Sequence, residues 1–237
     1  MKILGYSERG IINSLIFTIG NDKELMAEFI ALIGIPELKI GNPKDYTILL
    51  EQSFSRFGDA DLVIIIHYEK PEDNKVLFIE GKVKTSSGNW NIQYQFDKYF
   101  DKVQYDKKEK YNGYSSNLFF QLYLKKLLFV NCTASEFEKG ITEPKFDDIR
   151  KIGENKVVLK ALKKIKKCKE AYYIGLIPSR KAGIQDLICK EDYKNDLHND
   201  ELTLHFLSWK KVHNFCKREE KLKKVVKIFK YNKGQIY

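Results

Sequence analysis

The chain has 237 residues, of which 43% are hydrophobic, 13% aromatic and 31% charged. This composition predicts a folded core and excludes wholesale disorder, because disordered chains are poor in aromatic residues. The 42 Lys and Arg outnumber the 32 Asp and Glu, which gives a formal charge of +10. Such a surplus favours a polyanionic partner, nucleic acid first and an acidic membrane surface second. A Lys-rich genome would give the same surplus without any such partner.

The sequence predicts neither a membrane segment nor a disulfide framework. No stretch approaches the roughly 18 consecutive apolar residues of a membrane span, and the first ten residues turn polar too early for a signal peptide. The four cysteines lie far apart and form no C-x-x-C pair, which argues against a zinc ribbon. We therefore expect a protein of the reducing cytoplasm that does not associate with membranes.

The first part of the chain predicts two helices. One begins with Ser7 as its N-cap, because apolar residues recur behind it at helical spacing. The second covers residues 23–33 and ends at Gly34 and Pro36. Both helices have one apolar face, so we expect them to lie against a core.

Three strands are predicted next. Residues 46–50, 61–67 and 76–83 are rich in β-branched and aromatic side chains. The run Leu-Val-Ile-Ile-Ile within 61–67 is typical of a strand buried on both faces. A turn segment at 69–75 joins the last two strands into a hairpin or meander, and residues 86–88 close it.

Helices and two late strands complete the prediction. The helices begin at Asn89 and cover residues 117–129 and 155–169, the strands cover 171–178 and 202–207, and a basic helix begins at the cap Ser208. No linker or repeat interrupts this order. We expect one α/β domain over residues 1–237, with a mixed central β-sheet flanked by helices, a core at about 7–207 and a basic C-terminal helix at 208–237.

The residues with the strongest chemical signal lie on the predicted hairpin. Glu80 and Lys82 share a face of their strand, since side chains at i and i+2 point the same way. Asp61 opens the neighbouring strand, and a small offset or bulge would bring it beside Glu80. Two carboxylates with one ammonium leave a surplus negative charge, which suits a hard divalent cation such as Mg²⁺. Mg²⁺ held by few carboxylates usually binds water and substrate phosphate as well, an arrangement suited to cleaving phosphodiesters.

Asp61 followed by Glu80-x-Lys82 resembles the signature of the PD-(D/E)XK nuclease superfamily. The first half of the motif reads Ala-Asp here, where Pro-Asp is the family's form. The segment from Gln95 to Tyr99 is similar to the Q-h-x-x-Y element of the RecB-like branch. The resemblance covers roughly residues 7–207 and implies a restriction-endonuclease-like fold.

The resemblance also implies roles for these residues. Asp61, Glu80 and the backbone carbonyl of Gly81 would bind Mg²⁺, for which Mn²⁺ would substitute. Lys82 would orient the attacking water and neutralise charge in the transition state. Gln95 and Tyr99 would position the backbone phosphate or the lysine.

Four further residues are weaker candidates. Asp59 could replace Asp61 as a ligand, although Asp is common in Gly-bounded turns. Glu8 could reach the site from the first helix, or simply suit a helix N-terminus. Glu51 is a similar case, and Lys84 could touch phosphate or be solvated.

These observations predict a cytoplasmic, Mg²⁺-dependent nuclease that hydrolyses phosphodiester bonds, with DNA as the first candidate substrate; the sequence does not distinguish DNA from RNA. The absence of a helicase suggests a restriction–modification or other defence endonuclease, or a repair nuclease, and two-strand cutting would favour a homodimer. One alternative is a non-catalytic nucleic-acid-binding protein on the same fold. Another is a basic interaction protein with a chance motif, in which Asp61 and Glu80 would lie far apart.

Overall fold

The computed structural model describes residues 5, 7–84, 90–105, 116–131, 152, 154–178, 181–199 and 202–236. Within these residues five strands form one sheet in the order β1–β2–β3–β4–β5. The strands are β1 (Asp45–Ser53), β2 (Asp59–His67), β3 (Lys75–Gly81), β4 (Glu170–Ile177) and β5 (Leu204–Ser208). β1, β2 and β3 form an antiparallel meander, and β4 and β5 continue the sheet in parallel with β3. The predicted α/β class with a mixed central sheet is therefore confirmed.

The centre of the sheet is covered on both faces. β2 is buried at every position from Ala60 to Ile66, as its β-branched composition predicts. Alternate side chains of each strand enter two separate hydrophobic clusters, one on each face.

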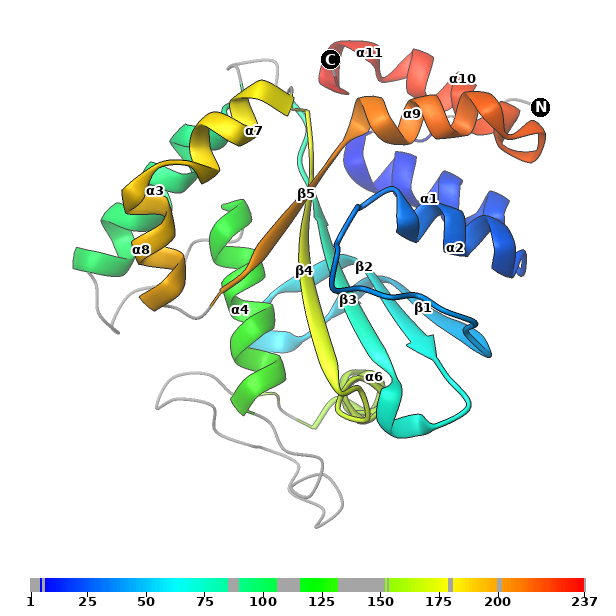
Figure 1. Cartoon of the computed structure of the whole chain (residues 1–237), viewed down its shortest axis with the longest axis horizontal. Coiled ribbons are helices and arrows are strands. Elements are labelled where there is room, and N and C mark those ends of the chain that lie inside the picture. Colours follow the sequence, from blue (N-terminus) through cyan, green and yellow to red (C-terminus); the bar gives the residue numbers. More distant parts are fainter. Residues whose placement is uncertain are drawn as a thin grey trace.

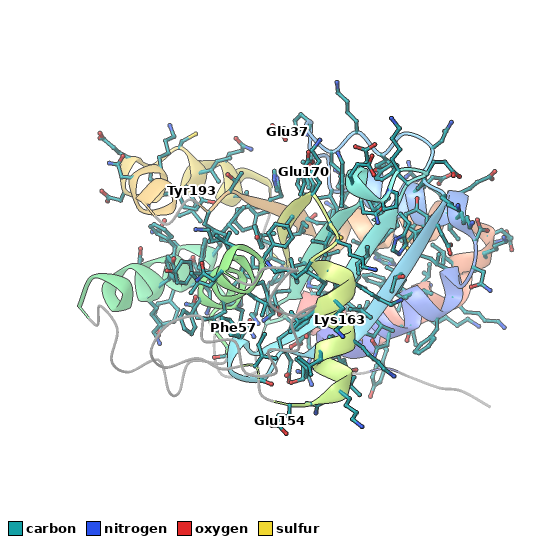
Figure 2. The ribbon with its side chains drawn as sticks, turned by 90° about the horizontal axis from the view of Figure 1, so that it is seen from below. Glu37, Phe57, Glu154, Lys163, Glu170 and Tyr193 are labelled. Atoms are coloured by element: carbon teal, nitrogen blue, oxygen red, sulfur yellow. The ribbon has the colours of Figure 1, made fainter. Side chains whose placement is uncertain are left out.

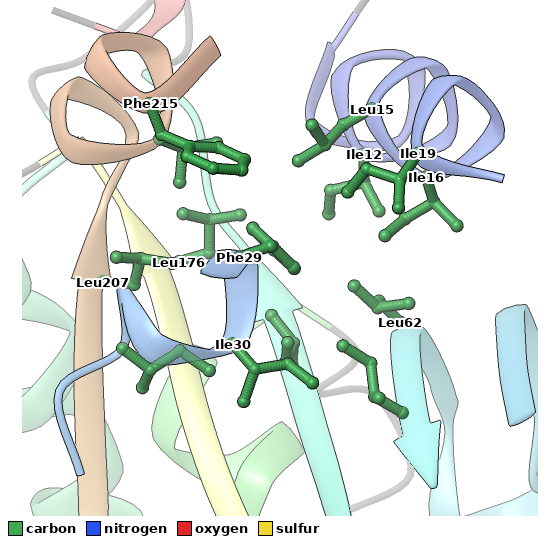
Figure 3. Packing of buried hydrophobic residues seen from close by; sticks show 14 of the residues in the cluster. Ile12, Leu15, Ile16, Ile19, Phe29, Ile30, Leu62, Leu176, Leu207 and Phe215 are labelled. Atoms are coloured by element: carbon green, nitrogen blue, oxygen red, sulfur yellow. The ribbon is translucent and has the colours of Figure 1, made fainter. Parts of the chain in front are cut away.

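One face is covered by helices from the two ends of the chain (Figure 1). These helices are α1 (Ser7–Ile19), α2 (Lys23–Ala31), α9 (Trp209–Arg218), α10 (Lys223–Tyr231) and the short α11 (Lys233–Ile236). Figure 3 shows Ile12 of α1, Phe29 of α2 and Phe215 of α9 directed toward Leu62 and Leu176 of the sheet. The C-terminal helices are thus part of the core, although the sequence placed them outside it.

The other face is covered by helices from the middle of the chain (Figure 1). They are α3 (Ile92–Tyr105), α4 (Leu118–Asn131), α6 (Lys156–Ile165), α7 (Lys181–Ile188) and α8 (Glu191–Asn199). α4 packs directly on β3 and β4, whereas α3 packs on α4 and α7. α6 lies at the end of the sheet where β4 begins, and the view from below shows it in front of the sheet with Lys163 on it (Figure 2).

Two expectations about elements were wrong. The sequence predicted no helix between the last two strands, but α7 and α8 lie there, because parallel neighbours such as β4 and β5 need a crossover connection. The C-terminal helix is also not continuous: Glu219 is extended and a 3₁₀ turn, Glu220–Leu222, separates α9 from α10. Residues 217–221 are all charged, so this segment has no apolar side chain to pack against the core, and the chain changes direction there. The predicted closing turn at 86–88 lies outside the described residues.

Candidate active site

The strand ends bring the two predicted carboxylates together. The β2–β3 ladder pairs Leu62 with Ile79, so the next position sets Asp61 opposite Glu80. Asp61 Oδ2 accepts a hydrogen bond of 2.7 Å from the Gly81 N–H, which ties the two strands at this point. The register itself achieves the juxtaposition, and no bulge between β2 and β3 is needed. The chance-motif alternative predicted that Asp61 and Glu80 lie far apart, and this prediction is wrong.

Glu80 is the most unusual group of the site. Its side chain is 1% exposed, and no donor in the described part of the chain makes a hydrogen bond to either carboxylate oxygen. Burial raises the pKa of Glu80 to about 7; the Lys125 and Lys82 ammonium groups oppose this shift, and the Asp61 carboxylate adds to it. A buried carboxylate without hydrogen bonds is unstable as an anion unless a cation joins it.

Lys125 is the ion-pair partner of Glu80 and was not predicted. Its side chain is 0% exposed, and Nζ lies 3.4 Å from Glu80 Oε1. Nζ also donates a hydrogen bond of 2.8 Å to the Phe57 carbonyl. Burial lowers the pKa of Lys125, while the nearby Glu80 and Asp61 carboxylates oppose the shift. A signal existed in the sequence, because Lys125 follows Leu118 and Leu122 at i+7 and i+3 in a helix that is apolar almost throughout.

Lys82 lies one residue beyond β3 and is half-buried. Its N–H donates to the Leu176 carbonyl at 2.8 Å, and its own carbonyl accepts from Trp209 Nε1 at 2.7 Å. The backbone is therefore fixed on both sides. Strand alternation directs Lys82 to the same side as Glu80, and its charge acts on the pKa of that carboxyl.

Arg9 of α1 connects Asp61 to a second acidic residue. Its Nε lies 3.5 Å from Asp61 Oδ1, and Nη1 lies 3.6 Å from Glu51 Oε2. Asn13 Nδ2 donates to Glu51 Oε1 at 2.6 Å. Glu51 has a φ of 48° and is skipped in the β1–β2 ladder, so the strand is irregular opposite Asp61. Glu51 thus contacts α1 and not Glu80, and sequence reasoning missed Arg9.

Glu8 and Asp59 lie around this site. The Glu8 stem covers Gly81 so closely that a Cβ on the glycine would lie 2.9 Å from Glu8 Cβ. Glu8 is half-buried, and the first helix does bring it to the end of β3. Asp59 is exposed at the start of β2, and its charge acts on the pKa of Lys125.

Gln95 and Tyr99 join α3 to α4. Gln95 Oε1 accepts from the Leu118 N–H at 3.0 Å, and the Gln95 carbonyl accepts from Asn117 Nδ2 at 2.7 Å. Tyr99 is 2% exposed, and its ring centroid lies 6.0 Å from that of Phe119. These contacts cap α4 and fill the core. Among the contacts of the described residues, α4 is the helix that brings a side chain to Glu80, through Lys125.

The oxygen atoms of Glu80 and Asp61 could bind a divalent cation. Glu80 has two buried oxygens that no described donor satisfies, and Asp61 lies beside it with the Gly81 backbone between the two strands. Carboxylate and carbonyl oxygens are the ligands that Mg²⁺ takes in proteins. Among the described residues, no group of three or more His, Cys, Asp or Glu is placed to hold a metal ion. A site here would thus use two carboxylates and the main chain.

The chain matches no family model, no curated protein and no solved structure with which it was compared. Across the ranges that the structure describes, every helix is too short or too polar to span a membrane.

Proposed function

We propose that the protein is a Mg²⁺-dependent nuclease of the PD-(D/E)XK type that hydrolyses phosphodiester bonds in DNA. The observation that carries the proposal is the Glu80 carboxylate: fully buried, without hydrogen bonds from described residues, and opposite Asp61. A buried carboxylate without hydrogen bonds lowers the stability of the fold. Such a group is therefore expected where it has a function. A mixed sheet flanked by helices is the class of fold that the resemblance implies, and restriction, other defence or repair are the roles that would follow.

Each residue has a role in this proposal. Asp61, Glu80 and the Gly81 carbonyl would hold the metal ion. The ion, when bound, supplies a water of lowered pKa and positive charge beside the phosphate. Lys82 donates hydrogen bonds toward the attacking water and neutralises charge that develops on the phosphoryl oxygens. Lys125 is a positioning residue, because its polar contacts in the described part of the chain are with Glu80 and the Phe57 carbonyl.

The test uses purified protein with supercoiled plasmid, linear duplex, single-stranded DNA and RNA, each with Mg²⁺, Mn²⁺ or EDTA. We expect metal-dependent cleavage of DNA that falls more than about hundredfold in Glu80→Gln and in Lys82→Met. Glu170→Gln is the matched control, because Glu170 is a carboxylate at the opposite end of the same sheet, where β4 begins.

Two results would reject the proposal. Cleavage that persists in Glu80→Gln would assign the chemistry to other residues. Salt-sensitive binding of DNA without cleavage of any substrate, unchanged in both variants, would favour the non-catalytic nucleic-acid-binding protein.

A further inference from the structure

Two stretches of the chain are strongly basic: residues 155–169, with seven Lys and no acidic residue, and the C-terminal helices. From Trp209 to Ile236 the chain has ten Lys and Arg against two Glu, so this stretch has a net charge of +8. All ten basic side chains are exposed. We call them the basic platform; its members are Lys210, Lys211, Lys217, Arg218, Lys221, Lys223, Lys224, Lys227, Lys230 and Lys233.

The platform projects outward because the apolar faces of its helices are buried. Trp209 and Val212 of α9 and Phe229 of α10 are each 0% exposed, and they pack in the cluster that covers the sheet. A basic helix that lies on a membrane inserts its apolar face into the lipid. Here those faces are already used by the core, and the exposed large hydrophobic side chain of α10 is Tyr231 at its end, so the platform offers mainly charge. This favours nucleic acid over a lipid surface.

The spacing on α10 suits a chain of phosphates. Lys223, Lys227 and Lys230 follow one another at i, i+4 and i+7, so they line one face of the helix. They span about 10 Å along the helix axis. Phosphates of one strand are spaced by about 3.4 Å along the duplex axis, so the row can meet several of them.

The helices that carry the platform are bonded to the strand end of the candidate active site. Trp209 Nε1 donates to the Lys82 carbonyl, and the Lys84 N–H donates to the Gln235 carbonyl at 2.6 Å. Asn232 Oδ1 accepts from the Ser7 N–H at 3.2 Å, which ties α10 to the start of α1. Figure 1 shows α9 continuing directly from β5, at the end of the sheet opposite α6.

We propose that the basic platform binds the sugar–phosphate backbone of a nucleic acid, independently of base sequence, at the end of the sheet where Asp61 and Glu80 lie. The inference rests on the proposed nuclease function for its purpose, but the binding itself requires neither metal nor cleavage. A row of lysines recognises phosphates by charge alone.

The test measures binding of a short fluorescent duplex DNA in EDTA by anisotropy, at salt concentrations between about 50 and 200 mM. One variant carries Lys223→Gln, Lys227→Gln and Lys230→Gln. The matched control carries Lys156→Gln, Lys160→Gln and Lys163→Gln, which are exposed lysines at the same spacing on α6 at the other end of the sheet. Circular dichroism confirms that both variants fold.

We expect the α10 variant to reduce the slope of log affinity against log salt by about 2.7, or about 0.9 for each lost phosphate contact, and the α6 variant to leave it unchanged. Equal losses in both variants would overturn the platform in favour of diffuse attraction, as would no loss in either. Binding to phosphatidylserine vesicles without binding to DNA would reassign the surface to membranes. If the α10 variant loses DNA binding and the wild-type protein cleaves no substrate in Mg²⁺, the platform is retained and the nuclease is rejected. If the wild-type protein cleaves DNA and the α10 variant binds DNA as the wild type does, the nuclease is retained and the platform is rejected.

Discussion

At the scale of single residues, the site depends on a pair of buried charges. Glu80 and Lys125 are both removed from water, and Lys125 also bonds to the Phe57 carbonyl. A buried pair contributes little net stability compared with apolar residues, but removal of one partner leaves the other uncompensated. The pair therefore fixes where the Glu80 carboxylate points more than it stabilises the fold.

Lys125→Met tests this. At pH 8.5 the variant must either ionise Glu80 without its partner or keep the carboxyl protonated far above its ordinary pKa. Either costs stability, and we expect the free energy of unfolding to fall by about 3–5 kcal/mol. The pKa of Glu80 is about 7 with Lys125 present and rises further without it. At pH 6 the carboxyl is therefore protonated, and the loss is limited to about 1–3 kcal/mol.

The measurement is urea unfolding at both pH values, with the double variant Lys125→Met/Glu80→Gln. In the double variant the loss would be smaller than the sum of the two single losses. An equal loss at pH 6 and pH 8.5 would show that packing alone explains the effect.

At the scale of elements, α1 lies unusually close to the end of β3. A Cβ on Gly81 would lie 2.9 Å from Glu8 Cβ and 3.3 Å from Ile12 Cδ1. Only a residue without a side chain allows this approach, which places the start of α1 over the candidate active site.

Gly81→Ala is therefore expected to lower the free energy of unfolding by about 1–3 kcal/mol, as overpacking does. Gly234→Ala is the control, because nothing lies within 4 Å of its Cβ position and it sits in α11. Thermal unfolding of both variants is the measurement. If the two alanines had the same effect, the close approach would carry no energetic cost.

Helices and strands with a strong hydrophobic pattern could be predicted from the sequence. Features that depend on contacts between distant parts of the chain could not. The β-branched run of β2 and the helical spacing of α1 determine those elements locally. The hairpin register then follows, and with it the meeting of Asp61 and Glu80. The position of α4 depends on how a distant helix docks on the sheet, so Lys125 could not be assigned to Glu80. α7 and α8 are short, and α8 is rich in polar residues; their existence follows from the topology instead.

At the scale of the whole molecule, the charge is unevenly distributed. Outside Trp209–Ile236 the chain is nearly balanced, with two net positive charges. Residues 155–169 hold seven Lys and no acidic residue, and Trp209–Ile236 has a net charge of +8, so the basic residues form two clusters. A Lys-rich genome would raise lysine throughout the chain and does not by itself account for this clustering.

Acid stability is a second property of the whole molecule. Burial lowers the pKa of His67 on β2, His205 on β5 and His213 on α9, in the last case to about 4. Between pH 6.5 and pH 4 His213 binds a proton in the unfolded chain but not in the folded chain. Its contribution to the free energy of unfolding is therefore fully present above pH 6.5 and is lost as the pH falls toward 4. Ionisation of Glu80 has the opposite sign, because its raised pKa stabilises the fold as the pH falls below 7.

We expect His213 alone to contribute a loss of about 1–3 kcal/mol between pH 7 and pH 4.5. Its ring stacks on Phe229 at 4.7 Å, so His213→Phe retains an aromatic ring and removes the proton site. Urea unfolding at the two pH values is the measurement, with the wild-type chain as reference. A pH dependence that is as steep in the variant would assign the acid sensitivity to other groups.

The indole of Trp209 has a consequence for how two ligands influence each other. Its N–H donates a hydrogen bond to the Lys82 carbonyl, which connects α9 to the end of β3. A shift of one of these elements is therefore expected to displace the other. Thermodynamic reciprocity then applies: if DNA tightens the affinity for a metal ion by some factor, the ion must tighten DNA by the same factor. Trp209→Phe would remove the N–H and retain the ring, and any such coupling that depends on this bond would weaken equally in both directions.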